Sequence, residues 1–417
     1  MFRRKIFETQ TIDTSGDFKK EFNRIKRIRH FFSAWETRYY SAELENLINS
    51  LDRMNETPET KVKLLFGFFK SDSVIINKCD DSNGEMTCLF GMAADIFAKY
   101  AGLCSNKKVI AKKLFAIYSK DEYSMCDFLI EKAGTFLSKK ALSDLMNVFW
   151  SAAENAVDRK SHFYLAIREL AEQMKEPELY EKACRAQHKG EILGGCCDDT
   201  AKVYLEAGKP QKALELLEKN PTPSHWRRER DNLLFQVYAA LENKEELIKT
   251  AWRIFLFERN INAFNILISV LGKERREELL AAEAAKILSS KNFSFADTRF
   301  LIDADKIDDA ENYLLKHALN LDGIYYSSLL SYAAAMENNK RWLASAMIHR
   351  ALLESILLRA NTKYYSYGVK YLLHLKILSD LIIDWESFKP HSQYFKEIKT
   401  DHKRKVSFWG KYSRRGG

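Results

Sequence analysis

Glycine and proline are scarce in this chain of 417 residues, which has 16 glycines and 6 prolines. Together they make up about 5% of the residues, whereas about 12% is usual. A β-sandwich or barrel of many short strands needs more turn residues, so this scarcity excludes those folds. Hydrophobic residues form 46% of the chain, which excludes a disordered chain and is enough for a large core.

Long apolar segments are also missing. The first ten residues, MFRRKIFETQ, carry basic side chains without the apolar stretch of a secretory signal. The longest uncharged stretch runs from residue 323 to residue 336 and is rich in Tyr and Ser. It is shorter than the ~20 apolar residues that span a bilayer. We therefore predict a cytoplasmic protein that does not cross a membrane.

The seven cysteines are odd in number and include no CxxC pair, so they do not indicate a secreted disulfide framework. Reduced thiols are expected. One group has four soft ligands within fourteen positions: Cys184, His188, Cys196 and Cys197. These residues could hold zinc tetrahedrally, or they could be buried core side chains. Because adjacent cysteines seldom aim both sulfurs at one ion, we predict no metal site.

Helical periodicity extends over almost the whole chain. Leu142, Leu145, Met146 and Phe149 lie at i, i+3, i+4 and i+7, the spacing of the apolar face of an amphipathic helix. Short polar turns separate such segments, and no strand is followed by a glycine-rich phosphate loop. The sequence therefore predicts an all-α fold.

An internal repeat indicates how these helices are arranged. Tyr204 and Ala213 are nine positions apart, and Tyr238 follows Tyr204 by 34 positions, which is the tetratricopeptide period. In that repeat an aromatic residue ends the first helix, and a small residue lets the second helix approach closely. Further copies run from Phe300 to Ala310 and, in degenerate form, from Tyr332 to Ala344. Since the intervals are irregular, we predict a degenerate tetratricopeptide-like solenoid of antiparallel helix pairs.

We predict three regions along the chain. Residues 1–158 form a helical N-terminal region that lacks the repeat, and residues 159–360 form the repeat array. Residues 361–417 form capping helices and a tail rich in basic and aromatic side chains. The first boundary is placed at the polar stretch Asp158-Arg159-Lys160-Ser161.

Three segments carry a resemblance to a known family. They are residues 238–257 with Trp252-Arg253-Ile254-Phe255, residues 343–371, and His391 together with HKRKVSFW at 402–409. From about residue 196 onward the chain resembles an uncharacterised bacterial family of unknown function, and its repeats are similar to the helical region of SWIM-type zinc-finger proteins. The resemblance implies a helical fold and no defined activity. SWIM proteins bind zinc through a CxC and a CxH pair, and neither spacing occurs here.

Known catalytic motifs are absent from the sequence. No GxSxG, HExxH, Walker A or dinucleotide fingerprint occurs. The nine histidines are scattered, and a lone histidine on a helix, such as His317 or His349, is typical of a cap or a core position. We predict that the protein is not an enzyme and needs no cofactor.

A helical array exposes a long groove that can hold a peptide or a protein. The leading interpretation is therefore an interaction scaffold with a protein or peptide partner. The candidate residues for this groove are Tyr204, Tyr238, Arg253, Arg350, Arg359 and Tyr365. Alternatively, the arginines of segment 346–371 lie along the surface while its tyrosines seal the helix pairs.

The net charge of +9 is concentrated at the two ends of the chain. Residues 1–30 carry +5 and residues 396–417 carry +6, which leaves −2 for the residues between them. The alternative function is a nucleic-acid-associated subunit of a bacterial defence or regulatory complex. Its candidate contacts are Lys403, Arg404, Lys405, Trp409, Arg414 and Arg415. The same tail also fits a helix whose Phe408 and Trp409 dock on the last repeat.

Overall fold

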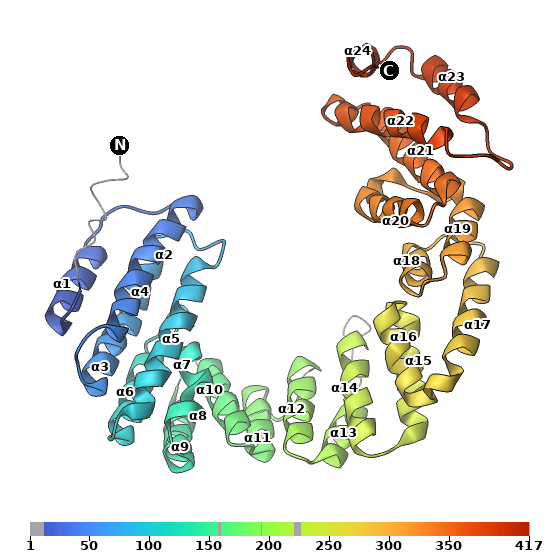
Figure 1. Ribbon diagram of the computed structural model, residues 1–417. Helices are drawn as coiled ribbons and strands as arrows, with labels where there is room; N and C mark the ends of the chain where they lie inside the picture. Colours follow the sequence, from blue (N-terminus) through green and yellow to red (C-terminus); the bar gives the residue numbers. More distant parts are fainter. Residues whose placement is uncertain (1–11, 157–159, 193, 221–226, 417) are drawn as a thin grey trace. The chain divides into compact units, whose positions relative to one another are not determined.

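A computed structural model describes residues 12–156, 160–192, 194–220 and 227–416 (Figure 1). The described part of the chain is all-α, with 77% of its residues in helices. Within the described ranges there is no sheet, and an isolated bridge joins Phe32 to Cys79. The predicted all-α fold is confirmed.

The chain divides into two compact units, residues 1–224 and residues 225–417. The division falls beside the segment Pro221–Pro223, which lies outside the described residues. The boundary predicted at residues 158 and 159 also lies outside them. The helices on its two sides, α9 (Lys139–Asn155) and α10 (Lys160–Gln173), pack against each other within unit 1.

Unit 1 contains helices of four to nineteen residues, many of which begin at a capping residue. For example, the Thr57 hydroxyl accepts the Thr60 N–H at the start of α3, directly before Pro58 at the first helical position. Besides α9 and α10, the elements of this unit are α1 (Ser15–Lys26), α2 (Ala34–Asn49), η2 (Ser50–Asp52), α3 (Pro58–Phe69), α4 (Asp72–Ile76), α5 (Glu85–Leu103), α6 (Lys107–Tyr118), α7 (Asp127–Glu131), α8 (Ala133–Phe136), α11 (Pro177–Gln187), α12 (Gly194–Glu206) and α13 (Pro210–Lys219).

Unit 2 begins with α14, and its elements follow one another in pairs that pack together. Its core contains the tightly grouped rings of Phe255, Phe264 and Phe300. The elements are α14 (Arg227–Ala240), α15 (Lys244–Glu258), α16 (Ile261–Leu271), η4 (Lys273–Arg275), α17 (Arg276–Ser289), α18 (Phe295–Asp303), α19 (Ile307–Lys316), η5 (Ala318–Asn320), η6 (Gly323–Tyr325), α20 (Tyr326–Asn338), α21 (Trp342–Arg359), η7 (Thr362–Tyr364), α22 (Tyr365–Ser379), α23 (His391–Asp401) and α24 (Val406–Arg414).

The same turn joins the two helices of five pairs: α10–α11, α12–α13, α14–α15, α18–α19 and α20–α21. After the first helix one residue has a left-handed backbone: Lys175 (φ 56°), Gly208 (72°), Glu242 (55°), Asp305 (59°) and Lys340 (59°). The next N–H then donates to the carbonyl five residues earlier, with N···O distances of 2.8 to 3.0 Å. This bond is the 6→1 bond of a Schellman cap, which satisfies a carbonyl at the helix end.

Four of these five pairs are the copies predicted from the sequence. The small residues expected at the close approach of the second helix are fully buried in three of them, at Ala213, Ala310 and Ala344. The pair α10–α11 has the same turn but was not predicted as a copy. The helix pairing is therefore confirmed at the level of local structure.

None of the helices in the described part of the chain combines the length and the apolar composition needed to cross a lipid bilayer.

Candidate functional site

The last helix, α24, packs on α22 through one aromatic side chain. Phe408 is fully buried, and its ring lies edge-on to Tyr365 with a centroid distance of 5.6 Å. A Cβ atom at Gly368 would lie 3.1 Å from the Phe408 ring, so glycine at this position allows the close approach. One face of the tail is thus fixed in the core of unit 2, as the docking alternative expects.

Two stretches of sequence without an acidic residue meet where these helices pack. Residues 355–379 contain four Lys or Arg side chains and no Asp or Glu, and residues 402–417 contain six and none. Segment 355–379 includes α22, and α24 lies in the second stretch. Packing α24 on α22 therefore produces a surface that is rich in cations.

Exposed tyrosines lie among these cations at the start of α22. Tyr364 and Tyr367 are 41% and 53% exposed, and Lys363 and Lys370 are exposed beside them. The Lys363 ammonium lies 5.9 Å from the Tyr364 ring, and the Lys370 ammonium lies 5.7 Å from the Tyr367 ring. Exposed cations and exposed tyrosine rings therefore lie close together in η7 and the start of α22.

Two cations of the α24 segment reach the same part of α22. The Lys411 ammonium donates to the Ser366 hydroxyl (3.2 Å), and the Arg415 guanidinium donates to the Ser366 carbonyl (3.4 Å). Neither group forms an ion pair among the described residues. We call the surface formed by Lys363, Tyr364, Tyr367, Lys370, Lys411 and Arg415 the basic face.

The residues predicted to contact nucleic acid divide into two groups. Lys403, Arg404, Arg414 and Arg415 are exposed. Lys405 and Trp409 are half-buried, and the Trp409 indole N–H donates to the His402 carbonyl (2.9 Å). An open hollow beside them is lined by Lys399, Lys403, Val406, Trp409, Gly410 and Ser413. The tail therefore combines a docked apolar side with exposed cations.

Four of the six residues predicted to line a groove for a partner are buried: Tyr204, Tyr238, Arg350 and Tyr365. Tyr204 belongs to unit 1, and its hydroxyl donates to Glu181 (2.7 Å). The other five residues belong to unit 2. Of these, Arg253 pairs with Asp231, whereas Arg359 is exposed and donates to the Ser355 carbonyl. Their role in partner binding stays a prediction.

Arg350 is an example of a predicted groove residue whose side chain contacts other parts of unit 2. Its guanidinium lies between the rings of Trp385 (4.7 Å) and Tyr394 (4.3 Å) and donates to the Lys389 carbonyl (2.7 Å). Burial lowers the pKa of Arg350, although the nearby Tyr394 and Glu354 act in the opposite direction. The side chain thus connects α21 to the segment that precedes α23.

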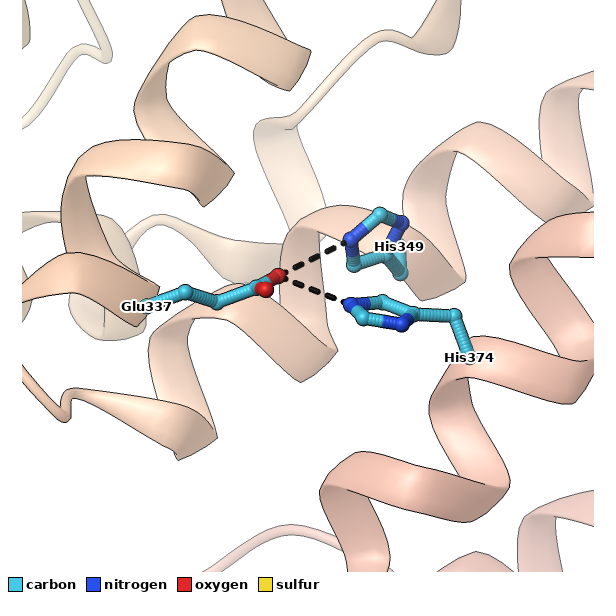
Figure 2. A group of neighbouring side chains, drawn as sticks. All are labelled: Glu337, His349 and His374. Carbon is cyan, nitrogen blue, oxygen red and sulfur yellow. Dashed lines mark hydrogen bonds and ion pairs between the residues drawn. The ribbon is translucent and has the colours of Figure 1, made fainter.

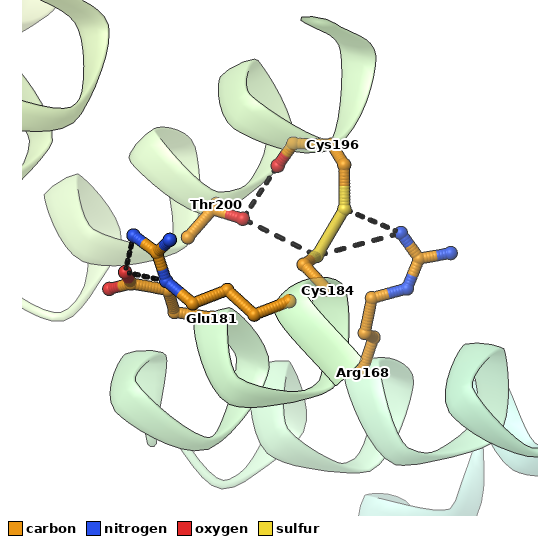
Figure 3. The surroundings of a disulfide bond; sticks show 6 residues. Arg168, Glu181, Cys184, Cys196 and Thr200 are labelled. Carbon is orange, nitrogen blue, oxygen red and sulfur yellow. Dashed lines mark hydrogen bonds and ion pairs between the residues drawn. A yellow bond between two sulfur atoms is a disulfide. The ribbon is translucent and has the colours of Figure 1, made fainter. Parts of the chain in front are cut away.

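Two of the four candidate zinc ligands form a disulfide, Cys184–Cys196, between α11 and α12 (Figure 3). The expectation of reduced thiols is therefore wrong for this pair. The packing of α11 on α12 brings the two Cα atoms to 6.4 Å, within the usual range for a disulfide. An Arg168 nitrogen lies 3.2 Å from the Cys196 sulfur. Cys197 is buried against the Leu216 carbonyl, outside this bond.

A second polar group lies between α20, α21 and α22 (Figure 2). The Nε2 atoms of His349 and His374 lie 3.3 and 3.0 Å from the same Glu337 oxygen. The Ser345 hydroxyl donates to that oxygen as well (2.6 Å). The hydrogen bond from His349, followed by those from Ser345 and His374, lowers the pKa of Glu337 to about 2 against the opposing effect of burial.

Sequence reasoning missed this group because its members are 12 and 25 positions apart on three helices. His349 was predicted to be a lone cap or core histidine. It is buried, but it lies beside two further potential metal ligands, Glu337 and His374. No local motif links the three residues, so the signal appears only once the helices are packed.

Comparison with protein families gives a match over nearly the whole chain. The model of a family described as "Family of unknown function (DUF6880)" covers residues 8–194 and 196–411. The chain belongs to this family. No curated protein matches the chain. The predicted resemblance to a family of unknown function is thus confirmed, and it extends over nearly the whole chain instead of beginning near residue 196. The similarity to SWIM-type proteins stays a prediction.

Proposed function

We propose that this DUF6880 protein binds single-stranded nucleic acid on the basic face. The proposal depends mainly on one observation: α22 and α24 bring together two stretches that contain ten Lys and Arg residues and no acidic residue. Cations in stretches of sequence without acidic residues attract phosphates, and counterions are released when a strand binds. The exposed rings of Tyr364 and Tyr367 supply stacking surfaces for bases.

A single strand fits this surface better than a duplex because the tyrosine rings can only stack on bases that are unpaired. The apolar side of α24 is already buried through Phe408, so the cations are held on a fixed helix. We further propose that the recurring helix pairs form a degenerate tetratricopeptide-like array that supports this face.

The experiment is a fluorescence anisotropy titration of labelled oligothymidine and oligouridine with the full chain. Wild type should bind, and the double variant Lys363→Gln/Lys370→Gln should bind at least about 10-fold more weakly because two phosphate contacts are lost. Tyr367→Ala should also weaken binding, since stacking contributes about 1–3 kcal/mol per base.

A matched control removes two positive charges from α6 in unit 1, with Lys108→Gln/Lys112→Gln. Both control residues are exposed, as are Lys363 and Lys370. The control should bind as wild type does. Equal weakening in both double variants would indicate a response to net charge alone and would contradict the proposal.

A protein-binding scaffold is the second candidate function, and a specific surface favours it. Four exposed apolar side chains lie within eight consecutive residues: Leu319 (99%), Ile324 (57%), Tyr325 (57%) and Tyr326 (62%). Cross-linking followed by mass spectrometry should identify a stoichiometric partner of the wild-type chain. The double variant Leu319→Ser/Tyr326→Ser should lose this partner. The control Leu256→Ser, which changes a residue exposed elsewhere in unit 2, should retain it. Recovery of no such partner would count against this candidate.

A further inference from the structure

We propose that Glu337, His349 and His374 form a binding site for a divalent transition metal ion, with Zn²⁺ as the ion that suits it best. The site would be a second property of unit 2, and it does not depend on nucleic-acid binding. Two imidazoles and one carboxylate are a ligand set that Zn²⁺ uses in proteins.

The distances within the group fit coordination by one ion. Zn²⁺ lies about 2.0–2.2 Å from nitrogen and oxygen ligands, so two ligands at a tetrahedral angle are roughly 3.3 Å apart. The two Nε2 atoms lie 3.3 and 3.0 Å from the Glu337 oxygen, and all three ligand atoms lie within 4.8 Å of one another. Figure 2 shows both imidazole rings directed at the carboxylate.

The hydrogen bonds that exist without an ion leave this group crowded. Ser345, His349 and His374 all approach one oxygen of Glu337, although a carboxylate oxygen has about two lone-pair sites. A metal ion between the three ligand atoms would accept one lone pair from each. The Ser345 hydroxyl could then keep its bond and orient the carboxylate from outside the coordination sphere.

His349 is the most deeply placed ligand. Its side chain is 8% exposed, and its Nδ1 atom is buried without a hydrogen-bond partner among the described residues. When Nε2 donates to Glu337, Nδ1 is an acceptor, and when Nε2 ligates an ion, Nδ1 carries the proton of the neutral ring. Desolvation around His349 also strengthens any charge interaction at Nε2.

The other two ligands provide the route to solvent. The side chains of Glu337 and His374 are 26% and 35% exposed. An ion could enter from that side, and a fourth position there would be filled by water or by an outside ligand. Three protein ligands with one open position distinguish this arrangement from a closed structural zinc site.

A comparable group in unit 1 is a poorer candidate. Asp121, Asp127 and His162 also lie close together. The carboxylate of Asp121, however, accepts the backbone N–H groups of Tyr123, Met125 and Cys126 and so fixes its own loop. In the Glu337 group, by contrast, two of the three bonds come from histidines that are themselves ligands.

The experiment uses the full chain after removal of any purification tag and treatment with a chelator that is then removed. Zn²⁺ is titrated by calorimetry, and Co²⁺ binding is followed by its visible absorption, which is intense only at a tetrahedral site. Wild type should bind one ion per chain. His374→Ala should bind at least about 100-fold more weakly, because loss of a ligand exceeds the 10–100-fold effect of losing an outer partner.

Two control variants locate the binding. His30→Ala removes a histidine that also pairs with a carboxylate, Glu36, but has no second histidine beside it. Cys88→Ser removes an exposed free thiol that could hold zinc elsewhere. Both should bind as wild type does. Absence of binding to wild type, or unchanged binding by folded His374→Ala, would overturn the proposal.

Discussion

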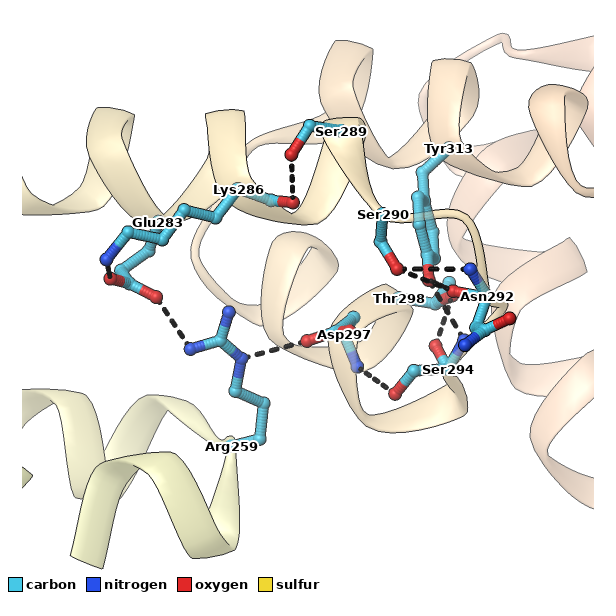
Figure 4. A network of polar contacts seen from close by, with 10 residues as sticks. All are labelled: Arg259, Glu283, Lys286, Ser289, Ser290, Asn292, Ser294, Asp297, Thr298 and Tyr313. Carbon is cyan, nitrogen blue, oxygen red and sulfur yellow. Dashed lines mark hydrogen bonds and ion pairs between the residues drawn. The ribbon is translucent and has the colours of Figure 1, made fainter. Parts of the chain in front are cut away.

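Arg259 connects three helices of unit 2 through a small network of charges (Figure 4). It follows α15, and its guanidinium donates to Glu283 on α17 (2.7 Å) and to Asp297 on α18 (2.8 Å). Lys286 donates to the other oxygen of Glu283 (2.5 Å). The Glu283 side chain is only 1% exposed, so its charge depends on these two partners.

Arg259→Ala should therefore be strongly destabilising. The substitution leaves the buried Glu283 with one cation fewer, and removing one partner of a buried pair lowers the free energy of unfolding by about 3–5 kcal/mol. Urea unfolding of the variant measures this loss. Arg299→Ala is the control because Arg299 is 53% exposed and pairs within its own helix, so a change of less than about 1 kcal/mol is expected. Equal effects of the two substitutions would contradict this role of Glu283.

Glu337 should make stability depend on pH in the acid range. Its pKa in the folded chain is about 2, against an ordinary value of 4.5. A lowered pKa stabilises the folded state above pH 4.5, and that contribution is lost as the pH falls from 4.5 towards 2. In chelator, wild type should lose more stability over this window than Glu337→Gln. Parallel pH profiles of the two proteins would show that the carboxylate has no such effect.

For single residues, the sequence predicted which small side chains are buried better than it predicted which side chains contact one another. The burial of Ala213, Ala310 and Ala344 followed from the repeat, because a small residue is needed where two helices approach closely. The contacts of Arg350 and the grouping of His349 with His374 depend on side chains from separate helices. No spacing in the sequence indicates such contacts before the helices are packed.

At the scale of elements, the recurring turn is the clearest shared feature of the helix pairs. Its left-handed position is glycine at residue 208 and lysine at residue 340, where a side chain is strained. A Cβ atom at Gly208 would meet no atom within 4 Å, so only the backbone conformation opposes a larger residue there.

Gly208→Ala should lower the free energy of unfolding by about 1 kcal/mol, and Lys340→Gly should raise it by up to about 1 kcal/mol. Thermal and urea unfolding measure both changes. Gly67→Ala is the control: Gly67 lies inside α3 and its Cβ would also meet no atom within 4 Å, so alanine should stabilise the chain by about 0.5–1 kcal/mol. A loss of stability in Gly67→Ala equal to that in Gly208→Ala would contradict the argument from the turn.

The elements were largely predictable because helix signals are local. Apolar periodicity, the Glu176-Pro177 start of α11 and the aromatic residues that precede the turns each act within a few positions. The Cys184–Cys196 disulfide was not predictable, because it depends on how α11 packs on α12. Four soft ligands in a short segment are compatible with a metal site, a core or a disulfide alike.

For the whole molecule, the division into two units was less predictable than the fold class. The boundary expected near residue 158 lies outside the described residues and stays a prediction, and the division into two compact units falls between residues 224 and 225. The helices α9 and α10 pack together, and this packing joins the pair α10–α11 to the helices before it. A composition shift does not reveal such packing.

The charge distribution belongs to the same scale and motivates the central claim. Packing places segment 355–379 beside the tail, so the positive charge of the C-terminal end extends over α22. Linear charge counts alone confined this charge to residues 396–417.

The most direct test is the salt dependence of oligonucleotide binding by the full chain. If about four cations of the basic face contact phosphates, a plot of log affinity against log salt should have a slope near −3, since each contact on a single strand contributes about −0.7. Lys363→Gln/Lys370→Gln should make the slope less negative by about 1.4. A slope near zero, or a slope that these substitutions leave unchanged, would contradict nucleic-acid binding by α22 and α24.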